Sequence, residues 1–159
     1  MWQAAYPFFA WHQQIWMSKA IQDSVYAFPI IETIHILAMA VMFGCMLVMN
    51  IKLMRLGFKR QPITLLSKTL LPAANVALLV MLATGYMMFS SEAIKDFSND
   101  GFKFKMASLA LALIFQVTLY RSVVRGGDDK PAGLRIGSAL ACFLLWFCVG
   151  VGGRAIGFV

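Results

Sequence analysis

The sequence predicts an all-α integral membrane protein, built as a four-helix up-down bundle with a short N-terminal interfacial helix. Two observations lead to this fold class. The chain of 159 residues is 60% hydrophobic and only 13% charged, whereas roughly a quarter of the residues in a soluble domain are charged. The apolar residues also form four long runs, and a helix needs about 20 such residues to cross the hydrocarbon core. The lipid bilayer is therefore the expected partner.

The four apolar runs define the predicted spans within a single domain over residues 25–157. Glu32 is the only charged residue of the first run, and the second run has none. The third and fourth runs reach spanning length when residues at their ends are included, with basic side chains extending to the interface. Because the connections are short, consecutive helices are expected to be antiparallel neighbours. The predicted spans are residues 25–51, 69–91, 104–124 and 135–156.

The segment 1–24 is expected to form a short helix at the membrane–water interface. It holds three of the four tryptophans, together with Tyr6, Phe8 and Phe9. Aromatic rings favour this interface because one side of the ring can lie in an apolar environment and the other in water. The segment has no basic n-region and no small-residue cleavage site, so it is not expected to be a cleaved signal peptide.

Basic residues are concentrated in two connections of the chain. One group lies between the first and second spans, and the other lies between the third and fourth. The positive-inside rule places both connections in the cytoplasm of a bacterium, and both termini in the periplasm, with the protein in the inner membrane. Topology thus explains the net charge of +7, and no nucleic-acid partner is expected. The two groups are Lys52, Arg55, Lys59, Arg60 and Lys68, and then Arg121, Arg125, Lys130 and Arg135.

Polar residues from all four spans meet at the opposite, periplasmic level of the predicted bundle. They are Glu32 and His35 in the first span, Thr84 in the second, Lys105 in the third and Arg154 in the fourth. Ionisable groups are costly inside a membrane, and they usually pair or line a functional cavity. Lys95, Asp96 and Asp100 are instead expected to form a solvated loop face. His12, in the interfacial segment, is also expected to be solvated, with a role as a ligand as the alternative.

A stripe of six residues on one face of the first span begins at Glu32 and His35. The spacing alternates between three and four residues, which keeps the whole stripe on one helix face, expected to point into the bundle. Methionine at helical spacing commonly fills a core, and Glu32 could form an ion pair with Lys105 or Arg154. The stripe consists of Glu32, His35, Met39, Met42, Met46 and Met49.

Haem b is the first cofactor that suits this level of the bundle. His35 is the candidate axial ligand. The opposite side could be taken by a methionine, by a second histidine if the N-terminal segment with His12 folds back or a second subunit contributes, or by no protein ligand. Lys105 and Arg154 would meet the propionates, and Glu32 would orient the imidazole as a hydrogen-bond acceptor. A quinone head group between His35 and Lys105 would complement such a haem. The leading hypothesis is therefore a small redox protein that exchanges electrons with quinone or with another membrane or periplasmic protein.

Copper binding or transport is the alternative cofactor hypothesis. Imidazole and thioether groups are soft enough for Cu(I), and a series formed by His35, Met39, Met42 and Met46, continued by Met49, could pass an ion along the helix. A third hypothesis is an accessory or assembly subunit without a cofactor, in which the polar level is an ion-pair lock between helices. A homo-oligomer is a further possible partner. No spacing typical of metal hydrolases and no nucleophile elbow is present, so nothing in the sequence indicates a hydrolase. The sequence does not decide whether the chain is another kind of enzyme.

Several segments together resemble a known family. They are FPIIETIH, MNIKLMRLGFKRQP, LATGYMMFSSEAIKDFSNDGFKFKM and WFCVGVGGRAIGF. In order and spacing they resemble a family of small bacterial four-helix membrane proteins known as a domain of unknown function. More remotely, the layout is similar to CopD-type copper-resistance proteins and to HemJ-type proteins that bind haem b. The remote resemblance implies functional roles for His35 and Lys105, and for Arg55 as a basic residue after the first span.

Overall fold

The structure is a computed structural model that describes residues 6–58 and 60–156. Predictions that concern residues 1–5, Lys59 and residue 157 therefore lie outside the described residues. The described part of the chain is almost entirely helical and contains no strand, which confirms the predicted fold class. Four helical segments are long and apolar enough to span a membrane: Ala27–Leu53, Ile63–Ser98, Asp100–Asp129 and Ala132–Ala155.

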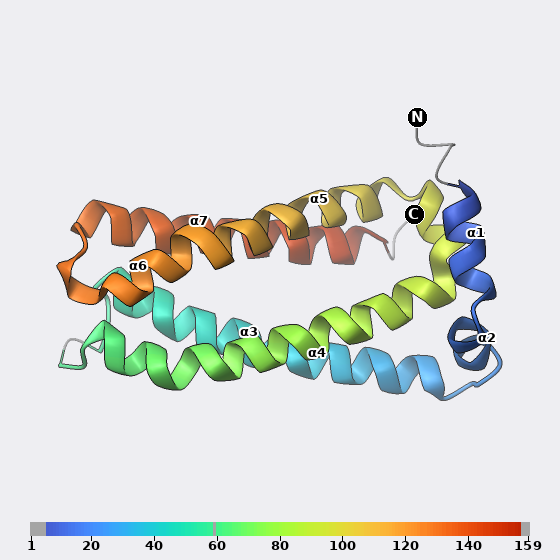
Figure 1. Cartoon of the computed structure of the whole chain (residues 1–159), viewed down its shortest axis with the longest axis horizontal. Helices are drawn as coiled ribbons and strands as arrows, with labels where there is room; N and C mark the ends of the chain where they lie inside the picture. Colours follow the sequence, from blue (N-terminus) through green and yellow to red (C-terminus); the bar gives the residue numbers. More distant parts are fainter. Residues whose placement is uncertain (1–5, 59, 157–159) are drawn as a thin grey trace.

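The four spanning segments are packed as two pairs. Helix α3 (Ala27–Leu53) packs along α4 (Ile63–Ser98), and α5 (Asp100–Phe115) packs along α7 (Ala132–Ala155). Between α5 and α7 the chain continues through a π-helix, η2 (Gln116–Tyr120), then α6 (Arg121–Gly126) and a short turn, η3 (Gly127–Asp129). Figure 1 shows the two pairs close together at the end that holds α6. We call this the basic end of the bundle.

The prediction that all consecutive helices pack as neighbours is wrong for α4 and α5. These helices diverge, and the two pairs are separated at the end where α5 begins (Figure 1). The N-terminal helices α1 (Tyr6–Gln14) and α2 (Trp16–Gln22) lie across this end, which we call the α1–α2 end. Phe9 of α1 packs between the two helices in a cluster of aromatic rings, with ring centroids 5.2 Å from Phe97 and 6.3 Å from Phe102. Phe89 of α4 also stacks on Phe102 of α5, with ring centroids 5.4 Å apart, so rings of α1, α4 and α5 together join the two pairs at this end.

The N-terminal segment is docked on a kink in α4 and does not lie alone at the interface. Glu92 has non-helical backbone angles (φ −120°, ψ 23°), which interrupt the helical hydrogen bonds around it. Gln13 accepts a hydrogen bond from the Ile94 N–H at 3.0 Å, and Ser18 donates to the Ser90 carbonyl at 2.9 Å. Gln22 donates to the Ser91 carbonyl at 2.8 Å. Side chains of α1 and α2 thus satisfy backbone groups on both sides of the kink.

Two hydrogen bonds between side chains join the π-helix to its neighbours inside the apolar core. The Tyr120 hydroxyl donates to Asn50 Oδ1 at 2.9 Å, and the Trp146 indole N–H donates to Gln116 Oε1 at 2.9 Å. All four side chains are buried. Gln116 and Tyr120 are the two ends of the π-helix, so the irregular turn aims one residue at α3 and the other at α7.

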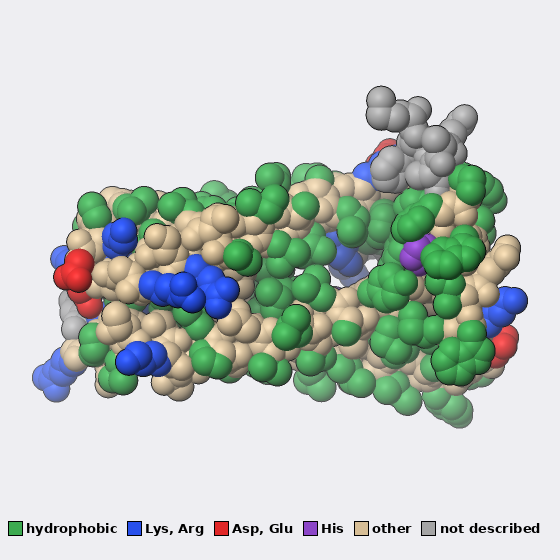
Figure 2. All heavy atoms as spheres, viewed as in Figure 1, with side chains coloured by type: hydrophobic (Ala, Val, Ile, Leu, Met, Phe, Trp, Pro, Cys, Tyr) green, Lys and Arg blue, Asp and Glu red, His purple; other side chains and the backbone are tan. Residues whose placement is uncertain are grey.

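The outer faces of the spanning helices are strongly apolar. Large side chains such as Leu37, Leu79 and Leu144 are each at least 60% exposed. Figure 2 shows apolar side chains spread along the bundle, with Lys and Arg side chains gathered at the basic end. An exposed apolar surface of this extent is expected where lipid is the solvent, because burial inside the protein is not needed to remove it from water.

Candidate functional site

The centre of the candidate site is the imidazole of His35 on α3. Its Nδ1 atom lies 2.9 Å from the hydroxyl oxygen of Thr84 on α4. The Thr84 hydroxyl itself donates to the Val80 carbonyl oxygen, 2.7 Å away. A hydroxyl has one proton, so when Thr84 uses it on a carbonyl its oxygen must accept the Nδ1–H of His35. The contact therefore selects the tautomer that leaves a lone pair on Nε2.

Gly85 provides the surface on which the His35 ring lies. A Cβ atom added at this position would be 3.3 Å from His35 Cε1 and 3.8 Å from Nδ1. The glycine thus permits a closer approach of the ring to α4 than an alanine would permit. Gly85 thus allows the position of the imidazole, and Thr84 fixes its tautomer.

Charged residues of α3, α4 and α5 act on this level of the bundle. The charges of Lys105 and Glu32 both lie close enough to His35 to interact with it electrostatically. Lys105 also interacts with Asp96, whose side chain is only 7% exposed. The prediction that Asp96 belongs to a solvated loop face is therefore wrong, because α4 continues to Ser98 and carries Asp96 inward beyond the kink. Asp96 joins the candidate site as an acidic residue that sequence reasoning had set aside.

Glu32 and Arg154 occupy less central places than predicted. Glu32 lies on the exposed side of α3 and not on the face that turns into the bundle, and it forms no ion pair among the described residues. Arg154 is exposed in the last turn of α7, at the same end of the bundle. Lys105 lies deeper, where α5 and α7 approach so closely that a Cβ at Gly152 would be 3.0 Å from Lys105 Cα.

His12 is the second histidine of the chain, and the prediction that it is solvated is wrong. It is only 6% exposed, because α1 folds across the end of the bundle. Its ring lies against Phe89 and Tyr86 of α4, with centroid distances of 5.8 and 6.0 Å. Its Nδ1 donates to the Phe8 carbonyl at 3.0 Å, and a carbonyl oxygen can only accept, so Nε2 again holds the lone pair.

The two histidines thus contact neighbouring turns of the same helix. His35 lies on Thr84 and Gly85, and His12 lies on Tyr86 and Phe89. Residues 84 to 89 span a rise of about 7.5 Å in an α-helix. Figure 2 shows a hollow in this face of the molecule between the two helix pairs, toward the α1–α2 end, with a basic side chain inside it.

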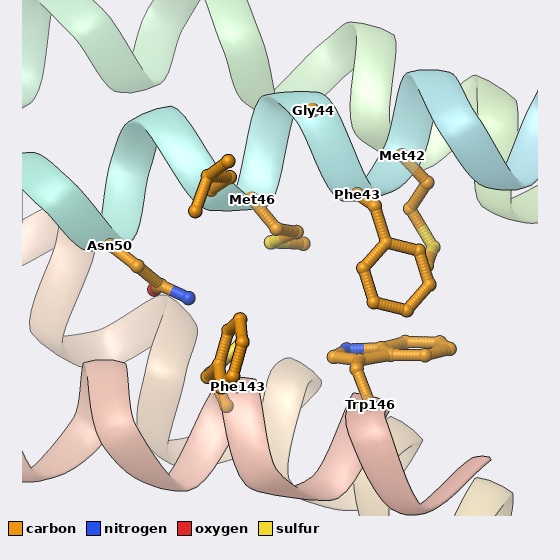
Figure 3. Close-up of a pocket in the computed structure, with 9 residues that line it drawn as sticks. Met42, Phe43, Gly44, Met46, Asn50, Phe143 and Trp146 are labelled. Carbon is orange, nitrogen blue, oxygen red and sulfur yellow. The ribbon is translucent and has the colours of Figure 1, made fainter. Parts of the chain in front are cut away.

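The methionine stripe continues from His35 into the core, as its spacing predicts. Met42, Met46 and Met49 are buried and Met39 is half-buried. Met42 and Met46 line a cavity of about 150 Å³ between α3 and α7, which also includes Cys142. Figure 3 shows Met46 and Asn50 of α3 on one side of this cavity and Phe143 and Trp146 of α7 on the other. Two thioethers and one thiol are thus among the groups that line it, whereas His35 does not line it.

The ligand types most often used for metals do not gather in the described part of the chain. Within residues 6–58 and 60–156 there is no group of three or more His, Cys, Asp or Glu side chains that could hold a metal ion. A metal bound at the level of His35 would need few protein ligands, as an iron porphyrin does. A metal in the cavity of Figure 3 would need thioether ligands.

A comparison with protein families assigns the chain to one of them. A model described as "Family of unknown function (DUF6644)" matches residues 8–159. The chain belongs to this family. No curated protein and no solved structure matches it. The expected resemblance to a family of unknown function is thus confirmed, and the comparisons give no evidence for a likeness to CopD-type or HemJ-type proteins.

The DUF6644 match contains the whole candidate site, from His12 to Arg154. Sequence reasoning identified His35, Thr84 and Lys105 by their common level. It favoured a solvated position for His12 and Asp96 and gave Gly85 no role, because their places depend on how α1 folds back and where α4 bends. The polar pair Ser90–Ser91 at the end of a predicted span was a possible signal for the bend. It could not be interpreted without the side chains of α2 that donate hydrogen bonds to the carbonyls of this pair.

Proposed function

We propose that this DUF6644 member is a small multi-pass protein of the bacterial inner membrane that binds one b-type haem at the α1–α2 end. In this proposal it exchanges electrons with quinone or with a partner protein. The observation that carries the proposal is the His35–Thr84 contact of 2.9 Å, which leaves Nε2 of the imidazole as a ready ligand. Histidines that bind metals typically donate the other ring N–H to a neighbouring group in this way.

The orientation proposed for the protein follows from its charges. The basic end carries the positive residues of both connections, which favours a cytoplasmic location for this end. The α1–α2 end, His35 and both chain termini are then periplasmic. The haem would lie near the periplasmic surface, where a soluble or membrane-bound redox partner can approach.

Residues at this level of the bundle could bind the iron and the propionates of a haem. His35 would bind the iron, and His12 is the candidate for a second ligand because its Nε2 also holds a lone pair. Lys105 and Arg154 would neutralise the propionates. When bound, haem supplies one-electron chemistry, while the protein sets its surroundings through these side chains. The cysteines at 45, 142 and 148 lie outside any C-x-x-C-H motif, so a haem here would be held without thioether bonds.

Absorption spectroscopy of the detergent-purified protein, oxidised and dithionite-reduced, tests this proposal together with iron analysis. A Soret band and iron near one atom per chain are expected, and His35→Ala should lose both. His12→Ala should keep the haem but change its spin state, as seen by electron paramagnetic resonance. A His35→Ala variant with full haem content would overturn the proposal, and so would a colourless wild-type protein after expression with added haem.

Copper binding is a second candidate, favoured by the cavity between α3 and α7. Met42, Met46 and Cys142 line this cavity, and thioether and thiolate ligands select Cu(I). The arrangement differs from the predicted series, because Cys142 of α7 takes the place that His35 was expected to fill. Anaerobic titration with Cu(I) against a competing chelator should give one site that Met42→Leu with Met46→Leu abolishes. A protein that binds neither haem nor copper would favour the cofactor-free accessory subunit.

A further inference from the structure

A groove at the basic end of the bundle lies outside the site described above. It runs between the first turns of α4 and α6, and its volume is about 400 Å³. Its floor and walls combine basic, hydroxyl, amide and apolar side chains. The residues that line it are Thr64, Ser67, Lys68, Leu71, Pro72, Asn75, Arg121 and Arg125.

The charge of this groove has no counter-charge among the residues that line it. Lys68, Arg121 and Arg125 contribute three cations from two different helices, and no carboxylate lines the groove. None of the three takes part in an ion pair within the described residues. Like charges brought together repel one another, and an anion in the groove would relieve this repulsion.

The nearby acidic residue Asp128 is already engaged elsewhere. Its carboxylate accepts a hydrogen bond from Arg135 at 3.0 Å and another from the Ile63 N–H at 3.4 Å. These contacts hold it at the start of α4, next to the connection that it belongs to. Asp128 therefore stabilises the turn between α6 and α7 and does not neutralise the groove.

The groove lies at the depth where the head groups of a bilayer are found. Lys68 immediately precedes the uncharged run 69–91, and Arg121 immediately follows the uncharged run 106–120. Both cations therefore mark the edge of the apolar part of the bundle. Leu71 and Pro72 line the same groove on its apolar side, in a position to contact an acyl chain.

We propose that this groove binds the phosphate group of an anionic phospholipid in the leaflet on the basic side. Two guanidinium groups suit phosphate because each can donate two parallel hydrogen bonds, and Asn75 adds a neutral donor. Basic pockets between membrane helices are recurrent sites for such head groups. The proposal is independent of the haem proposal, because the groove shares no residue with the site around His35.

Native mass spectrometry of the purified protein, with added phosphatidylglycerol or cardiolipin, tests this proposal. Wild-type protein should retain an anionic lipid in preference to phosphatidylcholine. The variant Lys68→Gln/Arg121→Gln/Arg125→Gln should bind it about 100-fold more weakly, since each basic residue near the membrane contributes roughly a fivefold preference. The matched control is Arg60→Gln, which removes an exposed cation of the same end outside the groove and should bind as wild type.

A second variant distinguishes specific binding in the groove from non-specific attraction of anionic lipids to positive charge. Asn75→Leu changes no charge, and it should weaken the anionic lipid severalfold if the head group sits in the groove. Equal binding by wild type, Asn75→Leu and the triple variant would overturn the proposal. Displacement of the lipid by millimolar inorganic phosphate would overturn it as well, because the groove would then be a site for free phosphate. Circular dichroism confirms that each variant is folded.

Discussion

The imidazole of His35 donates a hydrogen bond to the hydroxyl of Thr84, with 2.9 Å between Nδ1 and Oγ1. The contact joins α3 to α4 at the level where polar residues of the bundle meet. It also determines which ring nitrogen keeps its lone pair, because the single proton of Thr84 is directed to a backbone carbonyl. The same two side chains thus join two helices and leave Nε2 of His35 able to bind a metal.

Thr84→Val should disturb the site without disturbing the bundle. Valine has nearly the shape of threonine but cannot accept the Nδ1–H, so the imidazole loses its fixed tautomer. Loss of such a supporting contact typically lowers metal affinity by about 10- to 100-fold. Haem retention during dilution, followed by the Soret band, measures this effect. Thr84→Ser is the control and should retain haem like the wild type, while equal retention by Thr84→Val would contradict the role assigned to the hydroxyl.

Gly85→Ala should push the His35 ring away from α4. The added Cβ would lie 3.3 Å from His35 Cε1, which is closer than an ordinary contact and requires the ring to move by a few tenths of an ångström. The expected result is weaker haem retention with unchanged helix content by circular dichroism. Gly44→Ala is the matched control, because a Cβ there meets nothing within 4 Å. That control should be neutral or more stable by about 1 kcal/mol.

Ser18→Ala should loosen the N-terminal helices from the kink in α4. Ser18 is buried, and its hydroxyl lies 2.8 Å from the His12 carbonyl oxygen and 2.9 Å from the Ser90 carbonyl oxygen, so its loss removes the donor that these two acceptors share. A cost of about 1–3 kcal/mol is expected for such a group. Faster amide hydrogen exchange in α1 and α2, with little change in α7, would show local release. Gln14→Ala, at an exposed position of α1, serves as the control and should exchange like the wild type.

Tyr120→Phe should destabilise the core near the π-helix. The Asn50 Oδ1 atom would lose the donor that lies 2.9 Å away, and both side chains are buried. Interhelical hydrogen bonds of membrane proteins contribute about 0.6 kcal/mol on average and up to about 1.7 kcal/mol. Thermal unfolding in detergent of Tyr120→Phe, Asn50→Leu and the double variant measures the coupling. Strictly additive losses would show that the two side chains do not stabilise each other.

The predicted spans illustrate how much of the fold can be read from the chain. The first span was predicted at residues 25–51 and α3 covers Ala27–Leu53, because the length of an apolar run is set by the thickness of the bilayer. The second was predicted at residues 69–91, but α4 runs from Ile63 to Ser98. Residues of α4 beyond the apolar run remain helical because α1 and α2 contact its C-terminal part and η3 contacts its first turn.

His35 and Asp96 show where prediction of the site succeeds and fails. The depth of His35 in the bundle follows from its position along the first apolar run. The sequence therefore predicts that it lies at the same depth as Thr84. The burial of Asp96 was not, because it results from a bend at Glu92 that side chains 70 to 80 residues earlier in the chain stabilise. Contacts between such distant segments leave no local pattern.

The sequence by itself determined that this protein has four segments long and apolar enough to cross a membrane, about where each of them lies and which end carries the positive charge. These properties follow from local composition, since the bilayer acts on each apolar run separately. Only the tertiary structure decided that α1 folds across the bundle and buries His12, that α4 and α5 diverge, and that Lys68, Arg121 and Arg125 share one groove. These properties depend on how distant side chains pack against one another, which no single segment of the chain specifies.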